Sequence, residues 1–134
     1  MAQLNKPSAT FFAPHLAIKV LRPAVEFYQT AFDAKTIRQF DNDDGSIHVA
    51  EMEIDGCIFH LHEEVVKSKQ LSLETLHATT LLIGVFCDDP DRFMVQAEKA
   101  GGRVTSPMQD FDYGYRQGVI TDPYGHQWLL QKRI

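Results

Sequence analysis

An internal repeat constrains this chain more than any other feature of its sequence. Four pairs of positions recur in the same order, the first two pairs 67 residues apart and the last two 69 apart: Pro23 and Pro90, Ala34 and Gly101, Gly56 and Gly125, Phe59 and Trp128. A single two-residue difference over such a length indicates duplication of one structural unit. The chain is therefore predicted to fold as two copies of one module.

Each copy shows the same order of elements: a strand, a helix and three further strands. The first copy is predicted to have a helix after Pro23 and strands over 15–20, 35–40, 46–54 and 57–63. The second copy is predicted to have a helix from Pro90, capped by Asp89, and strands over 79–87, 103–107, 115–121 and 127–132. We expect one domain over 1–134, formed by module one (12–63), a polar linker with a short helical turn (64–78) and module two (79–133).

The composition is that of an ordinary folded domain. With 44% hydrophobic and 23% charged residues among 134, the chain is long enough to bury a core without disulfides. The net charge of -5 and the lack of a Lys/Arg run argue against a nucleic-acid partner. No apolar stretch approaches the roughly 20 residues that cross a bilayer, so no membrane partner is expected. Cys57 and Cys87 lie in apolar strand-like runs, which favours buried thiols in the reducing cytoplasm.

Strand alternation sorts the side chains of each module onto two faces. In the strand over 57–63, Phe59 is expected to pack under the helix, which leaves His60 and His62 on the opposite, helix-distal face together with His15. In the second module the helix-distal face carries Leu82, Gly84, Phe86, Gln127, Leu129 and Gln131. We expect a trough between the two helix-distal faces, with three histidines on one side and a mostly apolar wall on the other.

Two segments resemble the vicinal oxygen chelate superfamily, which includes glyoxalase I, bleomycin-resistance proteins and extradiol dioxygenases. They are Ala-Val-Glu-Phe-Tyr-Gln-Thr-Ala-Phe at 24–32 and Tyr-Gly-Tyr-Arg-Gln-Gly-Val-Ile-Thr-Asp-Pro-Tyr-Gly-His-Gln-Trp at 113–128. The second segment is most similar to the PhnB-like branch. The resemblance spans about residues 12–133 and implies the α+β glyoxalase/bleomycin-resistance fold: two tandem βαβββ modules forming a curved mixed sheet with the helices on its outer face. It identifies a fold and not an activity, because the motif marks a turn and a core.

In the metal-using proteins that the chain resembles, each module supplies one ligand from its first strand and one from its last. The positions here are His15, His60, Leu82 and Leu129. Because leucine has no donor atom, the resemblance implies an incomplete four-ligand site. A divalent metal (zinc, nickel, iron or manganese) would need His15 and His60 together with His62 or Glu51 as a third ligand. The alternative is that these histidines are polar lining. The face on which Glu51 lies cannot be assigned, because both faces of its strand mix polar and apolar residues.

Two further candidates lie in the second module. Arg116 has a planar guanidinium that suits an anionic or carbonyl-bearing ligand, and its alternative is a structural ion pair with Asp110 or Asp112. Phe86, with Leu82 and Leu129, is expected to form an apolar wall of the kind that lines small-molecule sites.

These features favour a glyoxalase/bleomycin-resistance-like protein that binds a small, partly apolar molecule in the trough, without the four-ligand metal site and with no cofactor expected. The ligand-binding residues would be His15, His60, His62, Leu82, Phe86, Arg116 and Leu129. The alternative is a metal-dependent lyase, isomerase or dioxygenase acting on a substrate with vicinal oxygens, so the sequence leaves open whether the protein is an enzyme. The resemblance also implies a homodimer, and a protein that works only through such an interface is a third hypothesis.

Overall fold

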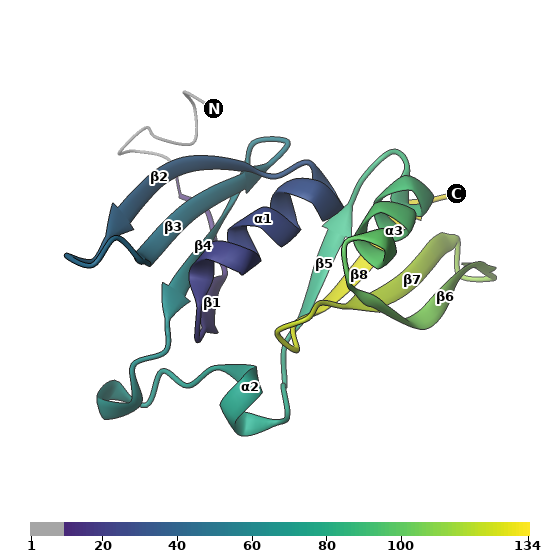
Figure 1. The fold of residues 1–134 in the computed structure, drawn as a ribbon. Coiled ribbons are helices and arrows are strands. Elements are labelled where there is room, and N and C mark those ends of the chain that lie inside the picture. The colour runs from purple at the N-terminus through teal and green to yellow at the C-terminus, as the bar shows by residue number, and fades with distance from the viewer. Residues whose placement is uncertain (1–9) are drawn as a thin grey trace. The chain divides into compact units, whose positions relative to one another are not determined.

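The computed structural model describes residues 10–134, so the first nine residues of the expected domain lie outside the described part. The described chain divides into two compact units. The first comprises the chain up to Gln29 together with Asp33–Ser72, and the second comprises Thr30–Phe32 and Leu73–Ile134. Each unit is built on its own four-stranded sheet (Figure 1).

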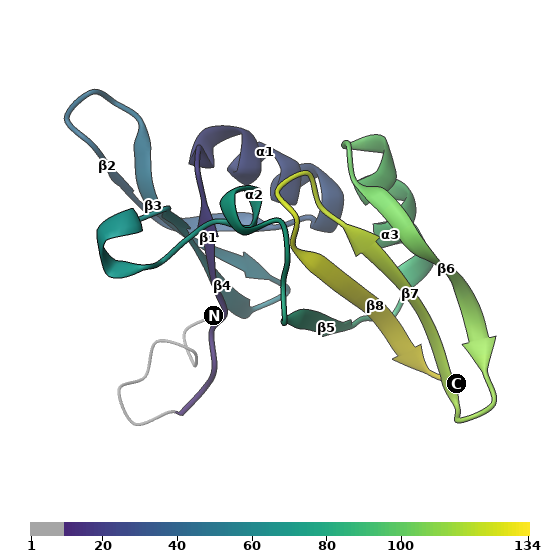
Figure 2. The same cartoon turned by 90° about the horizontal axis from the view of Figure 1, so that it is seen from below.

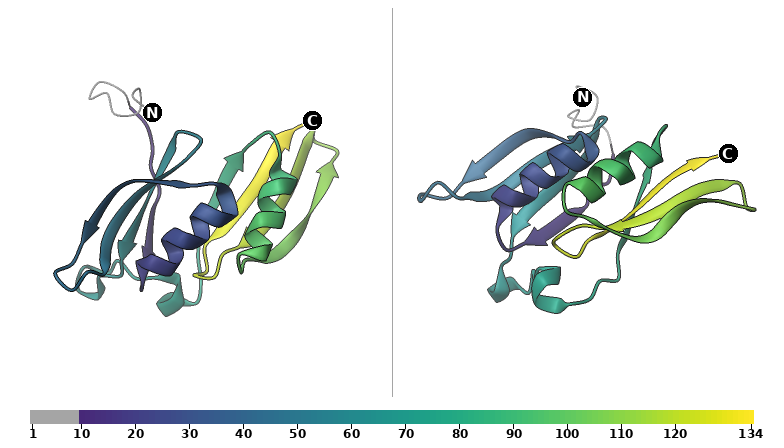
Figure 3. Two further views of the ribbon diagram at one scale, coloured as in Figure 1. Left: turned by 45° about the horizontal axis from the view of Figure 1, so that its top comes forward. Right: turned by 45° about the vertical axis from the view of Figure 1, so that its right-hand side comes forward.

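The first sheet has the strand order β1-β4-β3-β2. The elements of this half are β1 (His15–Ile18), α1 (Leu21–Phe32), β2 (Lys35–Asp41), β3 (Ile47–Ile54) and β4 (Cys57–Glu63). β1 runs parallel to β4, whereas β3 is antiparallel to both of its neighbours. α1 covers one face of this sheet (Figure 3), where the ring of Tyr28 meets the ring of Phe59 edge-on with centroids 5.5 Å apart. Leu16, Ile18 and Leu61 are fully buried on the same side, so the core of the first unit lies under α1.

The second sheet repeats this arrangement with the order β5-β8-β7-β6. Its elements are β5 (Leu82–Phe86), α3 (Pro90–Lys99), β6 (Arg103–Phe111), β7 (Tyr115–Thr121) and β8 (Gln127–Arg133). β5 runs parallel to β8, and the other pairs are antiparallel. α3 lies so close to β7 that a Cβ atom on Gly118 would come within 2.6 Å of Met94 Cε. Ile120, Trp128 and Leu130 are buried on this side.

Two short helical segments precede β5: a 3₁₀ turn at Val66–Ser68 and α2 (Leu73–Leu76). α2 lies beside the turn between β7 and β8 (Figure 2), where Gly125 has a φ of +98° and leaves room for Leu73. Both residues belong to the second unit. None of the helices in residues 10–134 combines the length and the apolar character needed to cross a membrane.

The prediction of an α+β fold built from two strand–helix–three-strand modules is confirmed. The expected mixed sheet is present as two four-stranded sheets, one in each unit. α1 begins at Leu21, so Pro23 is its third residue and not its first. Backbone N–H groups in the first turn of a helix have no partner within the helix, so a proline, which lacks this group, is tolerated there, and its fixed φ suits the helix. β6 continues past its predicted end through Pro107 to Phe111, which an edge strand permits.

The prediction of two buried cysteines is wrong. Cys57 is exposed, because it is the first residue of β4 and follows the Asp55–Gly56 hairpin turn directly, at the end of the strand. Cys87 is half-buried, and burial raises the pKa of its thiol above the ordinary value. Both are free thiols.

Candidate functional site

A row of polar side chains crosses the helix-distal face of the first sheet. The register aligns Arg38 with Glu51, Glu51 with His60, and His60 with His15. Paired residues in neighbouring strands point to the same face of a sheet. These four side chains therefore lie on the face opposite Phe59 and α1, and the register assigns Glu51 to that face.

His60 sits in the middle of this row and is held from two sides. Its ring stacks on the ring of His15 with centroids 4.5 Å apart and planes 25° apart. Its Nε2 lies 3.0 Å from Glu51 Oε2, and both side chains are about four-fifths buried, with 20% and 19% exposed. An ionised carboxylate only accepts, so Nε2 carries the proton and donates. The other ring nitrogen, Nδ1, is buried and has no hydrogen-bond partner among residues 10–134.

His15 is shifted towards its neutral form. Burial lowers the pKa of His15 below its ordinary value, and the positive charges that His60 and His62 can carry lower it further. The imidazole of His15 therefore faces His60 as an uncharged ring at neutral pH.

His62 belongs to a different cluster from His15 and His60. His62 Nδ1 donates to the backbone oxygen of Glu63 at 2.7 Å, and its ring meets the ring of His48 with centroids 4.9 Å apart. Glu63 Oε1 accepts from Asn42 Nδ2 at 2.7 Å and lies 3.0 Å from His48 Nδ1. These bonds, the one from Asn42 foremost, lower the pKa of the Glu63 carboxyl.

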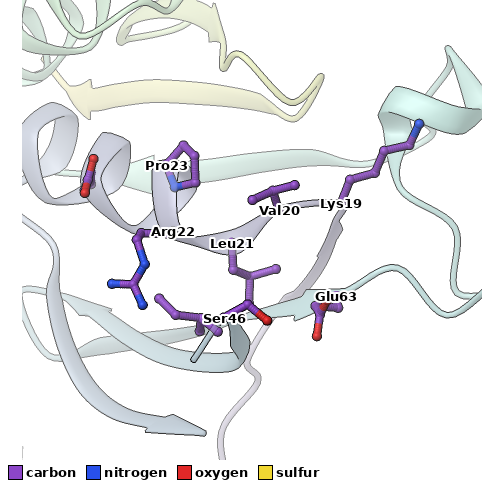
Figure 4. Close-up of a pocket in the computed structure, with 9 residues that line it drawn as sticks. Lys19, Val20, Leu21, Arg22, Pro23, Ser46 and Glu63 are labelled. Atoms are coloured by element: carbon purple, nitrogen blue, oxygen red, sulfur yellow. The ribbon is translucent and has the colours of Figure 1, made fainter. Parts of the chain in front are cut away.

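Glu63 also lines a cavity of about 460 Å³ at the start of α1 (Figure 4). The other lining residues are Lys19, Val20, Leu21, Arg22, Pro23, Glu26, Ser46 and Ile47. None of the site residues expected from the sequence is among them. This cavity is therefore separate from the His15–His60 pair, although both belong to the first unit.

The residues of the histidine face do not fit a divalent metal as they lie. Two imidazoles that share an ion must aim their lone pairs at one point about 2.0–2.1 Å from each nitrogen. Rings stacked nearly in parallel, as His15 and His60 are, aim their lone pairs side by side. Of the two expected third ligands, Glu51 binds His60, and His62 lies in a separate cluster with His48 and Glu63. Within residues 10–134 no group of three or more His, Cys, Asp and Glu side chains is placed to hold a metal.

The helix-distal face of the second sheet is mixed in character. Leu82 and Phe86 are 46% and 53% exposed and flank Gly84 on the edge strand β5. Leu129 pairs with Gly84 and is half-buried. We call Leu82, Phe86 and Leu129 the apolar strip. Beside it, Gln117 Nε2 donates to Gln131 Oε1 at 2.7 Å, so an amide pair borders the strip.

At the Phe86 end of this strip, further aromatic and charged side chains surround the Phe86 ring. The ring of Phe86 lies 5.8 Å from that of Tyr115, and the guanidinium of Arg133 sits 5.0 Å from the centroid of Phe86. Trp128 is instead part of the core under α3, 1% exposed, where its Nε1 donates to Asp122 Oδ2 at 2.9 Å.

Arg116 lies on the α3 side of the second sheet, on the same face as Gly118. Its Nε and Nη2 donate to the two carboxylate oxygens of Asp91 at 2.9 and 2.7 Å, and its Nη1 donates to Asp110 at 2.9 Å. This guanidinium lowers the pKa of the Asp91 carboxyl. The geometry favours the structural ion pair over a ligand-binding role, with Asp110 as one of the expected partners and Asp91 as a partner that the sequence did not suggest.

The second unit also contains a pocket of about 400 Å³ that sequence reasoning did not identify. It lies between the segment around α2 and the ends of β6, β7 and β8, and its lining includes Arg103, Thr105, Thr121 and Gln127. The lining residues come from three separate stretches of sequence, 73–79, 103–105 and 121–127. The cross-strand register, which aligns Arg103 with Thr121 and Thr121 with Gln127, brings the strand residues together.

Comparison with known proteins agrees with the fold. The family model of the Glyoxalase/Bleomycin resistance protein/Dioxygenase superfamily matches residues 12–130. The chain belongs to this superfamily. Among curated relatives of this superfamily member, the uncharacterized protein Rv0887c of Mycobacterium tuberculosis is 31% identical over 125 residues, which cover 91% of the present chain and 74% of that protein.

Solved structures place this superfamily member in the same fold. The crystal structure of TioX from Micromonospora sp. ML1 aligns with a TM-score of 0.71 at 21% identity, covering 93% of this chain and 97% of that one. The fosfomycin resistance protein FosX from Mesorhizobium loti aligns with a TM-score of 0.68 at 14% identity, covering 93% and 92%. At such identities the likeness shows a shared glyoxalase/bleomycin-resistance fold and nothing further.

Proposed function

We propose that this superfamily member binds a small, partly apolar molecule on the helix-distal face of its second sheet, without a metal ion. The observation that carries the proposal is the exposure of Leu82 and Phe86, 46% and 53%, on one face of β5 with only Gly84 between them on that face. Large apolar side chains grouped at the surface are typical of interaction sites. Leu129 belongs to the same strip and Tyr115 extends it, and small-molecule sites are lined mainly by such residues.

Polar groups next to the strip would orient the ligand. The amide pair Gln117–Gln131 presents a donor and an acceptor beside Phe86, whose ring can stack on a planar group. The first unit has a separate set of proposed polar contacts, His15, His60 and His62, on the helix-distal face of its own sheet. Among these, His60 Nδ1 is an acceptor that is buried without a hydrogen-bond partner among the described residues.

The donor set supports binding without metal. Leu82 and Leu129 have no lone pair, and His15 and His60 are stacked instead of convergent. Recognition would then rest on shape, stacking and hydrogen bonds. The sequence motif at 113–128 supports placing the chain in the PhnB-like branch as part of this proposal.

A homodimer is also part of the proposal. β5 is an edge strand, and its sequence Leu-Ile-Gly-Val-Phe carries no charge that would discourage pairing with another strand. The other edge of the second sheet, β6, carries Pro107, which disfavours pairing with another strand. In the first sheet, the edge strand β2 carries Lys35, Arg38 and Asp41, whose charges disfavour it as well.

The binding proposal is tested with Nile red, a neutral fluorescent probe of apolar sites. Leu82→Ser and Phe86→Ser should each weaken Nile red binding about fivefold or more, because each removes roughly 1 kcal/mol of apolar contact. Val95→Ser is the matched control, since Val95 is 51% exposed but lies on α3. Equal affinity for the wild type and all three variants would contradict the proposed site.

A further inference from the structure

The pocket of about 400 Å³ in the second unit has a polar lining that the proposed function does not use. One wall comes from the segment of chain before β5, and the other from the strand ends and the 123–125 turn. The polar side chains that line it include Arg103, Thr105, Thr121, Gln127, His77 and Thr79. Every lining residue belongs to the second unit, so the pocket is complete within it.

Arg103 is distinguished from the other arginines by what surrounds it. Within residues 10–134, no hydrogen bond, ion pair or ring contact involves its guanidinium. The remaining five each have a partner: Arg22 with the oxygen of Gly45, Arg38 with Phe40, Arg92 with Gln96, Arg116 with Asp91, and Arg133 with Phe86. A guanidinium carries five N–H donors and no acceptor, and its planar fork matches a carboxylate or phosphate.

Neutral hydroxyl groups lie next to this cation. The register pairs Arg103 with Thr121, which is 9% exposed, and Thr121 Oγ1 lies 3.3 Å from Thr105 Oγ1. Thr105 Oγ1 also donates to the oxygen of Val119 over a long 3.4 Å. Hydroxyl hydrogens rotate, so a charged acceptor in the pocket could draw one of these donors away from its weak bond.

Arg103 has no carboxylate partner within residues 10–134. Glu74 is the carboxylate among the described lining residues, and it takes part in an interaction of its own. No Asp residue lines the pocket within the described chain. An incoming anion would therefore meet a guanidinium that no carboxylate contacts.

The pocket and the apolar strip share one face of one sheet. A single row across the four strands aligns Leu82, Gln127, Thr121 and Arg103. The backbones of Leu82 and Arg103 are three strand spacings apart, roughly 14 Å. The distance between the ends of their side chains can be shorter, because both side chains lie on the same face. A small molecule can therefore touch Leu82 with an apolar part while its other end reaches Arg103.

We infer that the ligand of the second sheet is amphipathic and carries an oxyanion, a carboxylate or a phosphate, which Arg103 binds beside the Thr105–Thr121 hydroxyl pair. This inference rests on the proposed function, because it names the chemical class of the ligand for the same face. It goes further by assigning specificity to a residue outside the apolar strip.

Calorimetric titration of the full chain with two matched probes tests the inference. 4-Phenylbutyrate has a carboxylate at the end of an apolar body, and 4-phenylbutyramide is its neutral counterpart. The wild type should bind the carboxylate about tenfold more tightly than the amide, because charge-assisted hydrogen bonds are the stronger kind. Arg103→Gln should abolish this preference and leave amide binding unchanged. Arg92→Gln removes the same charge from α3 and should keep the preference.

The outcomes separate this inference from the proposed function. A preference for the carboxylate that survives Arg103→Gln, or the lack of any preference in the wild type, overturns the inference. If Nile red still binds through Leu82 and Phe86 in that case, the proposed function stands without an anionic ligand. If Nile red also fails to bind, both fall. Competition by acetate or by inorganic phosphate, lost in Arg103→Gln, supports the inference and tells which oxyanion the site prefers.

Discussion

The imidazole rings of His15 and His60 are stacked, with centroids 4.5 Å apart. The parallel pairing of β1 with β4 places the two residues directly opposite each other. These are also the positions at which metal-using proteins of the superfamily that the sequence resembles supply ligands from one module. Here Glu51 binds His60 Nε2, and the rings lie face to face. The first sheet therefore keeps two imidazoles in an arrangement suited to hydrogen bonding and stacking and unsuited to chelation.

The contact between Gly125 and Leu73 should be essential to the wall of the Arg103 pocket. A Cβ atom at Gly125, where φ is +98°, would lie 2.9 Å from Leu73 Cβ. Gly125→Ala should therefore cost about 1–2 kcal/mol for its left-handed backbone and about 1–3 kcal/mol more for the clash. Gly45→Ala is the matched control, because Gly45 has a φ of +88° and open space around it. Urea unfolding should show the larger loss in Gly125→Ala; equal losses would mean that α2 does not pack against this turn.

Asp122 should be the main anchor of the Asp-Pro-Tyr-Gly-His-Gln-Trp segment. It is 4% exposed, and its oxygens accept from Tyr124 N at 2.9 Å, His126 N at 3.0 Å and Trp128 Nε1 at 2.9 Å. Asp122→Ala leaves several buried donors unsatisfied and should cost about 3–5 kcal/mol in the free energy of unfolding. Asp122→Asn keeps one acceptor oxygen and should cost less. A loss below about 1 kcal/mol for the alanine variant would exclude this anchoring role.

The ion pair between Arg116 and Asp91 should make a contribution to stability that depends on pH. Arg116 lowers the pKa of the Asp91 carboxyl below its ordinary value of 3.8. The unfolded chain then binds the proton first as the pH falls, so the contribution is complete above about pH 4 and is lost as the pH drops through the lower, folded value. Arg116→Gln should lower the melting temperature by about 1–3 °C at pH 7, because the pair is partly exposed.

Calorimetry at pH 7 and at pH 2.5 checks this expectation. The difference in melting temperature between the wild type and Arg116→Gln should shrink towards zero at the lower pH. The same difference at both values would show that Arg116 acts through packing and not through its charge. Either result concerns the packing of α3 on β7 and does not test the proposed binding face on the other side of the sheet.

The fold was largely predictable from sequence because its signals are local. Asp55 and Gly56 both take positive φ values, 49° and 87°, in the hairpin turn that their identities favour. Asp89 caps α3 by accepting from Arg92 N at 3.1 Å, as expected from an Asp that precedes Pro90. The predicted ends of elements were wrong where tertiary contacts decide them. The strand predicted over 103–107 continues to Phe111, because β6 pairs with β7 over this length.

The site was less predictable because it depends on register and side-chain orientation. Alternation assigns His60 to a face, but only the pairing of β3 with β4 shows that Glu51 lies beside it. Arg116 illustrates the opposite case. The family resemblance suggested a ligand-facing position, whereas its alternation with Gly118, which packs under Met94, places it on the α3 side. Arg103 carries no sequence signal, because its pocket arises only when the segment around α2 lies beside the sheet.

The most direct test of the central claim is the metal content of protein purified without chelator or affinity nickel, measured together with thermal unfolding. We predict well under one equivalent of zinc, nickel, iron or manganese per chain, and no rise in melting temperature when these ions are added, since bound metal would stabilise the folded state by mass action. About one equivalent of metal per chain that raises the melting temperature, and that His60→Ala removes, would contradict metal-free binding and favour a metal-dependent lyase, isomerase or dioxygenase.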